Sequence, residues 1–190
     1  MMDWHDRIDN LATTLPFPRN TFVMDGGGVV GVWTMGNNYK VKSKYHGGYP
    51  NTYLRRMRAL FPDKRRALHV FSGRVDLTEF PGDTVDINDT LSPTFVDDCQ
   101  TLENVPLEDY DLILADPPYS GEDADHYGTT MVKRNKVMIA LTRVRPGTHV
   151  VWLDMVLPVY RKDVWKSEAD IGIRRSTNHR FRSVTIFRRL

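Results

Sequence analysis

The residues best suited to chemistry are Asp116, Pro117, Pro118 and Tyr119, four in a row. They follow residues 110–115, an apolar run with the length and composition of a buried parallel strand. Open α/β sheets bind ligands at the carboxyl ends of their strands, so this position indicates a site. Two consecutive prolines fix the backbone and remove two N–H donors, which leaves a stiff turn that offers carbonyl acceptors.

The turn suits an exocyclic amine on an aromatic base. Such an amine is a poor nucleophile, because its lone pair is delocalised into the ring. The Asp116 carboxylate and the Pro117 carbonyl could hold the two amine hydrogens and direct the lone pair at an electrophile. Tyr119 could stack on the base, a contact worth about 1–3 kcal/mol. A strand followed by a Pro-Pro turn without chemistry is the alternative.

These residues give the chain a resemblance to a known family. The sequence resembles the S-adenosylmethionine-dependent amino-methyltransferases of the DPPY type, which methylate adenine or cytosine in nucleic acid, over residues 47–190. The resemblance implies an enzyme in which Asp116, Pro117, Pro118 and Tyr119 are catalytic. It also implies S-adenosylmethionine as cofactor and S-adenosylhomocysteine as product. Adenine in DNA is the favoured substrate; an RNA base, or a non-catalytic module of the same fold, is the alternative.

The expected cofactor loop follows the first strand of the sheet, predicted at residues 67–71. Phe71, Ser72 and Gly73 are similar to the Phe-x-Gly loop of the family, in which glycine lets the backbone approach the ligand. Arg74 stands near the position of the usual second glycine, and residues 76–82 are too short and broken for the customary helix. The loop alone is therefore weak evidence for a cofactor.

Acids at the ends of two further predicted strands strengthen that case. A carboxylate can accept from both hydroxyls of a ribose, and by the resemblance this is the role of Asp86, with Ile87 packing on adenine. Asp98, with Cys99 beside it, is expected at the adenine amino group. Each acid alone could be a plain turn or cap. Upstream, the resemblance places two residues at the methionine end of the cofactor, Gly48 and Tyr49, just before a helix predicted at residues 52–60.

Two polar segments are expected to approach the substrate. Residues 120–128 read as a loop over the site, in which His126 and Tyr127 could touch the target base. A closing hairpin, with strands at 171–174 and 181–187, carries Asn178 and Arg180 in its turn. Either segment could equally be an exposed connection without a role.

The remaining patterns predict the elements that position these residues. Strands and helices alternate from Ala67 onward, which predicts a three-layer α/β fold in one domain. By resemblance this is the Rossmann-like class I methyltransferase fold, a mostly parallel seven-stranded sheet whose last strand is antiparallel. We expect a core at 46–190 and an extension at 1–45, with a helix at 3–14 and a glycine-turn hairpin at 21–33. Other expected elements are helices at 129–143 and around 160–168 and a strand at 149–153.

Charge is segregated although the net charge is only +2. Residues 76–125 carry acidic charges alone, whereas basic residues collect at 40–66 and 161–189 and could form a positive rim for phosphates. Solvated basic faces are the alternative. Nucleic acid is therefore the expected partner, DNA ahead of RNA. No segment is long enough for a target-recognition domain, so specificity could come from a hairpin, a loop or a partner protein. A monomer and a homodimer both remain open.

The rest of the composition bears on location and cofactors. One cysteine fits a reducing compartment, and the amino terminus lacks the pattern of a signal peptide, so we expect a cytoplasmic protein. No apolar run approaches the roughly 20 residues of a membrane span. The six histidines are scattered, and no metal site is expected.

Overall fold

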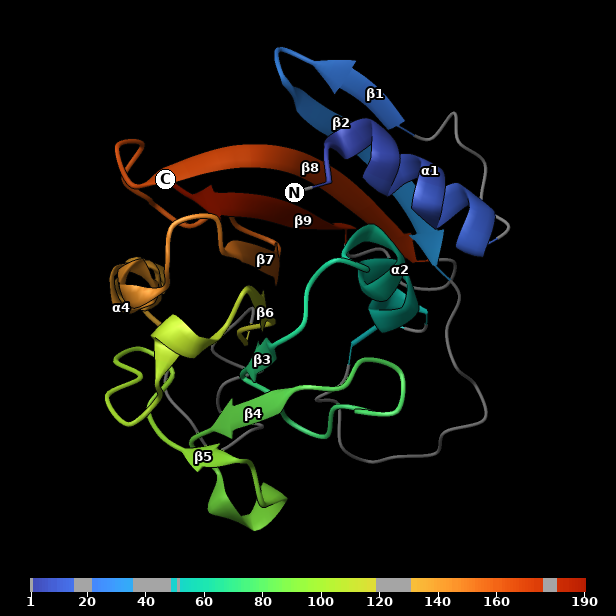
Figure 1. Ribbon diagram of the computed structural model, residues 1–190. Coiled ribbons are helices and arrows are strands. Elements are labelled where there is room, and N and C mark those ends of the chain that lie inside the picture. The colour runs from blue at the N-terminus through green and yellow to red at the C-terminus, as the bar shows by residue number, and fades with distance from the viewer. Residues whose placement is uncertain (1, 16–21, 36–48, 51, 119–130, 176–180) are drawn as a thin grey trace.

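The computed structural model describes residues 2–15, 22–35, 49–50, 52–118, 131–175 and 181–190 (Figure 1). The helices among them are α1 (Trp4–Thr14), α2 (Tyr53–Leu60) and α4 (Arg134–Ala140). The strands are β1 (Phe22–Asp25), β2 (Gly28–Met35), β3 (Ala67–Val70), β4 (Asp83–Asp86), β5 (Phe95–Val96), β6 (Leu112–Ala115), β7 (His149–Asp154), β8 (Trp165–Arg175) and β9 (Phe181–Arg189). Three short 3₁₀ turns complete the described elements: Asp89–Leu91, Leu107–Asp109 and Leu141–Arg143. No helix in these ranges is long and apolar enough to cross a membrane.

All nine described strands form one mixed sheet in the order β1-β2-β8-β9-β7-β6-β3-β4-β5. Neighbours from β7 through β6, β3 and β4 to β5 are parallel. Strand β9 is antiparallel to both β7 and β8, and β2 is parallel to β8. The parallel strands therefore end at a common side of the sheet, which we call the carboxyl edge, and begin at the opposite amino edge.

Side chains of the sheet alternate between two apolar clusters, and the α/β class expected from the sequence is confirmed. In β6, Leu112 and Leu114 pack into the cluster that contains α1 and α2. Ile113 and Ala115 point the other way, into the cluster that contains α4. Figure 1 shows α1 and α2 together on one side and α4 apart from them. A strand buried on both faces needs apolar residues at every position, as β6 has.

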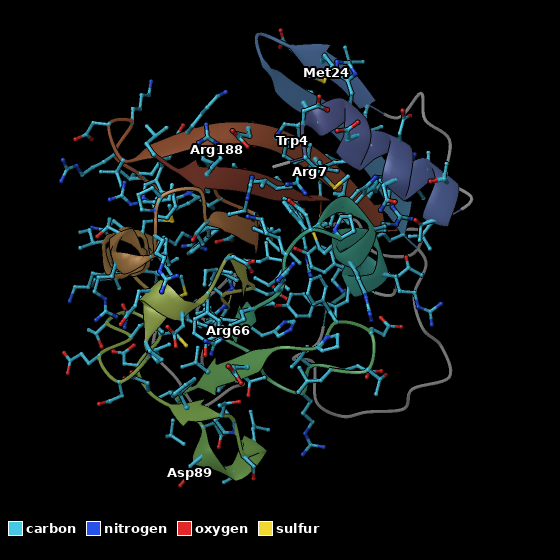
Figure 2. All side chains as sticks on the ribbon, in the orientation of Figure 1. Trp4, Arg7, Met24, Arg66, Asp89 and Arg188 are labelled. Carbon is cyan, nitrogen blue, oxygen red and sulfur yellow. The ribbon has the colours of Figure 1, made fainter. Side chains whose placement is uncertain are left out.

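The amino-terminal hairpin enlarges the sheet beyond the seven strands expected. Its turn is made by Gly26 and Gly27, both at positive φ, as a two-residue hairpin turn requires. Strand β2 then pairs along its length with β8, from Val29 to Met35. Alternate residues of β2 are buried and face the cluster of α1 and α2. This apolar face explains why the hairpin joins the sheet, placing Met24 at the opposite end from Asp89 (Figure 2).

Three expectations about helices meet different outcomes. The prediction of a helix around residues 160–168 is wrong. Strand β8 begins at Trp165, and the Trp165 ring is buried against Phe187. The helix predicted at 129–143 is shorter, since α4 gives way to the 3₁₀ turn Leu141–Arg143. As expected, no helix connects β3 to β4; turns occupy residues 71–82.

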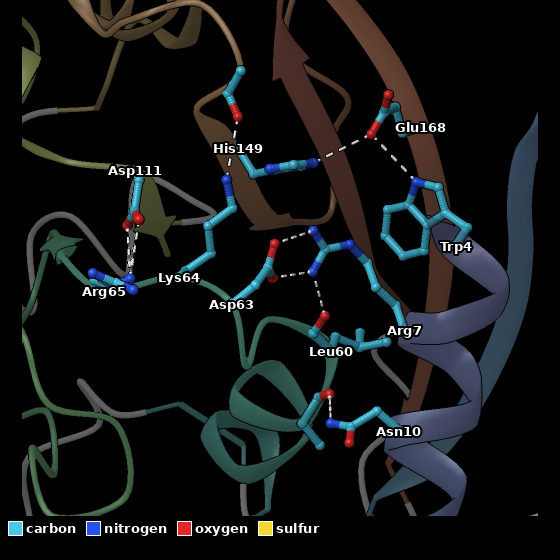
Figure 3. A network of polar contacts seen from close by, with 12 residues as sticks. Trp4, Arg7, Asn10, Leu60, Asp63, Lys64, Arg65, Asp111, His149 and Glu168 are labelled. Carbon is cyan, nitrogen blue, oxygen red and sulfur yellow. Dashed lines mark hydrogen bonds and ion pairs between the residues drawn. The ribbon is translucent and has the colours of Figure 1, made fainter. Parts of the chain in front are cut away.

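A polar network fastens the helices to the amino edge (Figure 3). Arg7 of α1 is buried, binds both oxygens of Asp63 at 2.7 and 3.1 Å, and donates to the Leu60 carbonyl at 2.7 Å. Across the sheet, Glu168 accepts from the His149 ring, the Trp4 indole and the Arg188 guanidinium. Burial lowers the pKa of His149, so this ring is neutral near pH 7 and donates its Nε2–H.

Candidate active site

Strand register brings the predicted loop, ribose acid and catalytic turn together. Val70 of β3 pairs with Val85 of β4 on one side and with Ala115 of β6 on the other. Phe71, Asp86 and Asp116 are the next residues of these strands, so they emerge side by side at the carboxyl edge. Two strand spacings separate the backbones of Asp86 and Asp116, about 10 Å. A cofactor of nucleoside size could bridge that distance.

Asp86 organises the loop that follows β3. Its Oδ2 accepts from the Gly73 N–H at 2.9 Å, and its Oδ1 accepts from the Asn88 N–H at 3.0 Å. A carboxylate has about four lone-pair sites, so these two bonds leave acceptor capacity for ribose hydroxyls. The residue therefore fits the predicted ribose role while it also holds the loop.

The loop after β3 has an uncommon backbone conformation. Phe71 lies in the left-handed region at φ 59°, which costs a non-glycine residue free energy, and Gly73 has φ 52°. The buried Ser72 between them donates its N–H to the Val85 carbonyl at 3.1 Å. The chain thus turns sharply at the strand end and directs the Gly73 N–H at Asp86.

The two predicted adenine contacts lie at the ends of β4 and β5. The Ile87 side chain is exposed, directly after Asp86. Asp98 is half-buried, and its Oδ1 accepts from the Gln100 N–H at 2.8 Å. The Cys99 thiol is buried in the core, and this burial raises its pKa. Only the backbone of Cys99 is therefore placed to meet a ligand.

The predicted catalytic turn that begins at Asp116 lies near two tyrosines. The Asp116 N–H donates to the Val70 carbonyl at 3.4 Å, and Pro117 and Pro118 are buried. The Tyr49 hydroxyl donates to the Leu114 carbonyl at 3.3 Å, and its ring stacks on Tyr53 with centroids 5.0 Å apart. Burial raises the pKa of both tyrosines; the Asp116 charge adds to this at Tyr49, and the Tyr49 and Asp116 charges add to it at Tyr53, so each remains a neutral phenol.

Two residues of this edge were missed in the sequence interpretation. Asp154 ends β7 and is fully buried, where Arg134 of α4 binds it with two hydrogen bonds of 2.6 and 3.1 Å. The signal was present, because Asp154 follows an apolar strand as Asp86 and Asp116 do. Tyr53 gave no signal, since one tyrosine on an amphipathic helix is ordinary.

Several basic residues of the two flanks have structural partners. Arg56 of α2 belongs to the basic flank at 40–66, but its side chain does not lie on the surface. It is buried 4.9 Å over the Trp33 ring, and burial lowers its pKa to about 10. Arg66 lies beside Asp109 at 3.1 Å, and Arg188 binds Glu168 at 2.6 Å. A positive rim would therefore have to come from the other basic residues of the flanks.

The remaining predicted contacts lie outside the described residues: Gly48, Tyr119, His126, Tyr127, Asn178 and Arg180. Within the described ranges, no group of three or more His, Cys, Asp or Glu side chains is placed to hold a metal ion. The chain matches no model of a known protein family, and no curated protein matches it.

Proposed function

We propose that the protein transfers a methyl group from S-adenosylmethionine to the exocyclic amine of a nucleic-acid base, with adenine in DNA as the favoured substrate. The observation that carries this proposal is the meeting of Gly73, Asp86 and Asp116 at adjacent strand ends. Strands β3 to β9 support it further. Their order, with the last strand inserted antiparallel beside β7, is that of the class I methyltransferase fold.

The cofactor residues have distinct tasks under this proposal. Asp86 accepts from the ribose hydroxyls, and Ile87 covers one face of the adenine. The carboxylate of Asp98 accepts from the adenine amino group. Tyr49 lies beside the Asp116 turn, at the position expected for the methionine end. Bound S-adenosylmethionine supplies a methyl group on a sulfonium, which is the electrophile of the reaction.

The Asp116 turn prepares the attacking nitrogen. The carboxylate accepts one amine hydrogen and the Pro117 carbonyl accepts the other, which moves the nitrogen toward tetrahedral geometry. A carbon–nitrogen bond then forms as the carbon–sulfur bond breaks. S-adenosylhomocysteine would leave as a neutral thioether, and the nitrogen, positively charged after the transfer, would release its proton to water, so the turn needs no strongly perturbed base. In a duplex, the target base has to leave the stack first, at a cost of a few kcal/mol.

A non-catalytic module that binds nucleic acid or a protein is the second candidate. Arg74 at the position of the second glycine, and turns in place of a helix between β3 and β4, favour it. Calorimetry with S-adenosylmethionine separates the two classes, because only the enzyme needs cofactor affinity. Heat of binding that disappears in Asp86→Ala supports the enzyme, and the absence of heat in the wild type contradicts it.

The reaction itself is tested with labelled S-adenosylmethionine and mixed DNA or RNA, followed by mass spectrometry of the nucleosides. Asp116→Ala is expected to lower transfer by at least about 10²–10³-fold while cofactor affinity is largely kept. Asp89→Ala removes an exposed acid of the 3₁₀ turn after β4 and is the matched control, with unchanged transfer. Equal loss of transfer and cofactor binding in Asp116→Ala would argue against the catalytic role.

A further inference from the structure

An exposed apolar loop projects from the end of β7. Four of its five residues are large, apolar and exposed: Met155 46%, Val156 52%, Leu157 54% and Val159 79%. Pro158 between them is buried. We call residues 155–159 the apolar loop. Single exposed apolar side chains are ordinary, but a contiguous group indicates a binding surface.

The apolar loop is held in place at its base. The buried Asp154 carboxylate accepts from the Met155 N–H at 2.6 Å and from the Val156 N–H at 3.3 Å. The same carboxylate binds Arg134 of α4 and accepts from the Trp152 indole at 3.3 Å. These bonds fix the direction in which the loop leaves the strand. The base of the loop is therefore fixed, and its apolar side chains face the solvent.

The position of the loop places it beside the catalytic turn. Trp152 of β7 pairs with Ala115 of β6, so Leu153 lies level with Asp116 on the neighbouring strand. Adjacent strands are separated by about 5 Å. The apolar loop begins two residues beyond Leu153, at the same carboxyl edge. A ligand that reaches Asp116 from this side passes the loop.

Basic residues follow the loop directly. Arg161 and Lys162 are both exposed, and Arg161 lies beside Asp163 in an exposed ion pair. Lys133, which precedes α4, is also exposed. Apolar side chains followed by cations are complementary to a nucleic-acid strand, which presents base faces next to phosphates.

We infer that the apolar loop contacts the faces of unstacked bases next to the target base, while Lys162 contacts the adjacent phosphate. This inference rests on the proposed function and names the protein surface that accepts the substrate strand. A base that leaves a duplex exposes the faces of its neighbours to water. Apolar side chains inserted there restore contact with those faces, as wedge residues do in proteins that kink DNA.

The binding test uses a fluorescein-labelled oligonucleotide duplex and its separate single strand. In the triple variant Val156→Ser, Leu157→Ser, Val159→Ser, we expect affinity to fall at least about tenfold, because apolar contacts with the base faces are lost. The salt dependence should stay unchanged, since no phosphate contact is removed. Lys162→Ala should instead reduce, by about one, the steepness with which the logarithm of the binding constant falls with the logarithm of the salt concentration. The triple variant Val23→Ser, Val30→Ser, Val32→Ser is the matched control, because these side chains are comparably exposed and lie on β1 and β2, which β8 and β9 separate from β7.

Failure of the inference and failure of the proposed function give different results. If the wild type binds and methylates and the loop variant does the same, the inference alone is overturned. If the wild type neither binds nor methylates, the proposed function falls and the inference with it. Binding that depends on the loop but occurs without methyl transfer supports the loop as a nucleic-acid surface and overturns the proposed enzyme. Loss of self-association, with oligonucleotide affinity unchanged, would assign the loop to a second copy of the chain and overturn the inference.

A second measurement does not depend on variants. Oligonucleotides that carry 5-iodouracil are photocrosslinked to the wild-type protein, and the crosslinked peptides are mapped by mass spectrometry. We expect crosslinks within residues 155–160, which include Met155 and Tyr160. Crosslinks confined to other segments would overturn the inference.

Discussion

The amino and carboxyl edges of the sheet hold their carboxylates in different ways. At the amino edge, Asp63 and Glu168 bind side chains from other elements, including the buried Arg7 (Figure 3). At the carboxyl edge, Asp86 and Asp97, near the ends of β4 and β5, accept mainly from backbone N–H groups of nearby loops. Asp154, at the end of β7, is the exception, because it also binds the Arg134 side chain. The first arrangement ties helices and strands together. The second shapes loops and keeps carboxylate acceptor capacity for a ligand.

The comparison predicts that the two edges separate stability from binding. Breaking the network around the buried Arg7 should destabilise the fold without a specific effect on the proposed ligand site. Removing an acid that organises a loop at the carboxyl edge should lower the free energy of unfolding less, but should weaken ligand binding more. We call the network of Arg7, Asp63 and Glu168 at the amino edge the clamp. The carboxyl edge is the proposed ligand site, although both edges contain similar residues.

The largest expected effect is at the clamp. Arg7→Ala leaves Asp63 and the Leu60 carbonyl without their cation, and only 1% of the Arg7 side chain is exposed. The free energy of unfolding should fall by about 3–5 kcal/mol. Chemical denaturation followed by circular dichroism measures it. Arg55→Ala is the control, because Arg55 is 62% exposed beside Glu79 and should cost no more than about 1 kcal/mol. Equal losses in the two variants would contradict the clamp.

Acid should weaken the same edge. Burial alone would raise the pKa of Glu168, but hydrogen bonds from His149 and Arg188 outweigh it and lower this pKa to about 2. As pH falls, the carboxyl of the unfolded chain binds its proton first, near pH 4.5, so this stabilisation is present above that pH. It is lost as pH falls from 4.5 to 2, a total of about 3 kcal/mol.

Two histidines act at higher pH, in the same direction. Burial lowers the pKa of His69 to about 4 and also lowers that of His149. The unfolded chain therefore binds protons below about pH 6.5 before the folded protein does, and stability falls from there. The free energy of unfolding, measured from pH 7 to pH 2, should fall first below about pH 6.5 because of the histidines and again below pH 4.5 because of Glu168. Glu168→Gln should remove most of the fall in the free energy of unfolding below pH 4.5, and an unaltered slope there would exclude Glu168 as its source.

The sequence predicted the parallel part of the fold well, because its signals are local. Strands β3, β6 and β7 are short and largely apolar; Asp116 directly follows β6, and Asp86 is the last residue of β4. Parallel neighbours then bring these ends together through register alone. The proximity of Asp86 and Asp116 could therefore be predicted without knowledge of any side-chain contact.

The parts that failed depend on contacts that local patterns do not carry. The β8 segment from Trp165 to Glu168 resembles a helix in spacing, and only its pairing with β9 makes it a strand. Partnering of β2 with β8 and the burial of Arg56 over Trp33 likewise arise from tertiary packing. The amino-edge clamp joins residues more than 50 positions apart, as Arg7 and Asp63 are.

At the carboxyl edge, Asp86→Ala sharpens the comparison. We expect the dissociation constant of S-adenosylmethionine to rise about 10–100-fold, since ribose acceptors and the Gly73 contact are lost together. Asp97→Ala is a matched control, because its carboxylate also accepts two backbone N–H groups, those of Asp98 and Asn104. Calorimetry and denaturation should show similar losses of stability in the two variants, but weaker binding in Asp86→Ala alone. An unchanged dissociation constant in Asp86→Ala would refute the ribose role.

The smallest effect concerns the two stacked tyrosines beside Asp116, and its sign is the informative part. The Tyr49 hydroxyl donates to the Leu114 carbonyl, so Tyr49→Phe should lower the free energy of unfolding by about 0.5–1.5 kcal/mol. The Tyr53 hydroxyl is buried with no hydrogen-bond partner among the described residues. Tyr53→Phe removes that unsatisfied group and should raise stability by up to about 1 kcal/mol. Chemical denaturation of both variants decides between them: a loss in Tyr53→Phe as large as in Tyr49→Phe would mean that the Tyr53 hydroxyl also contributes a hydrogen bond under the catalytic turn.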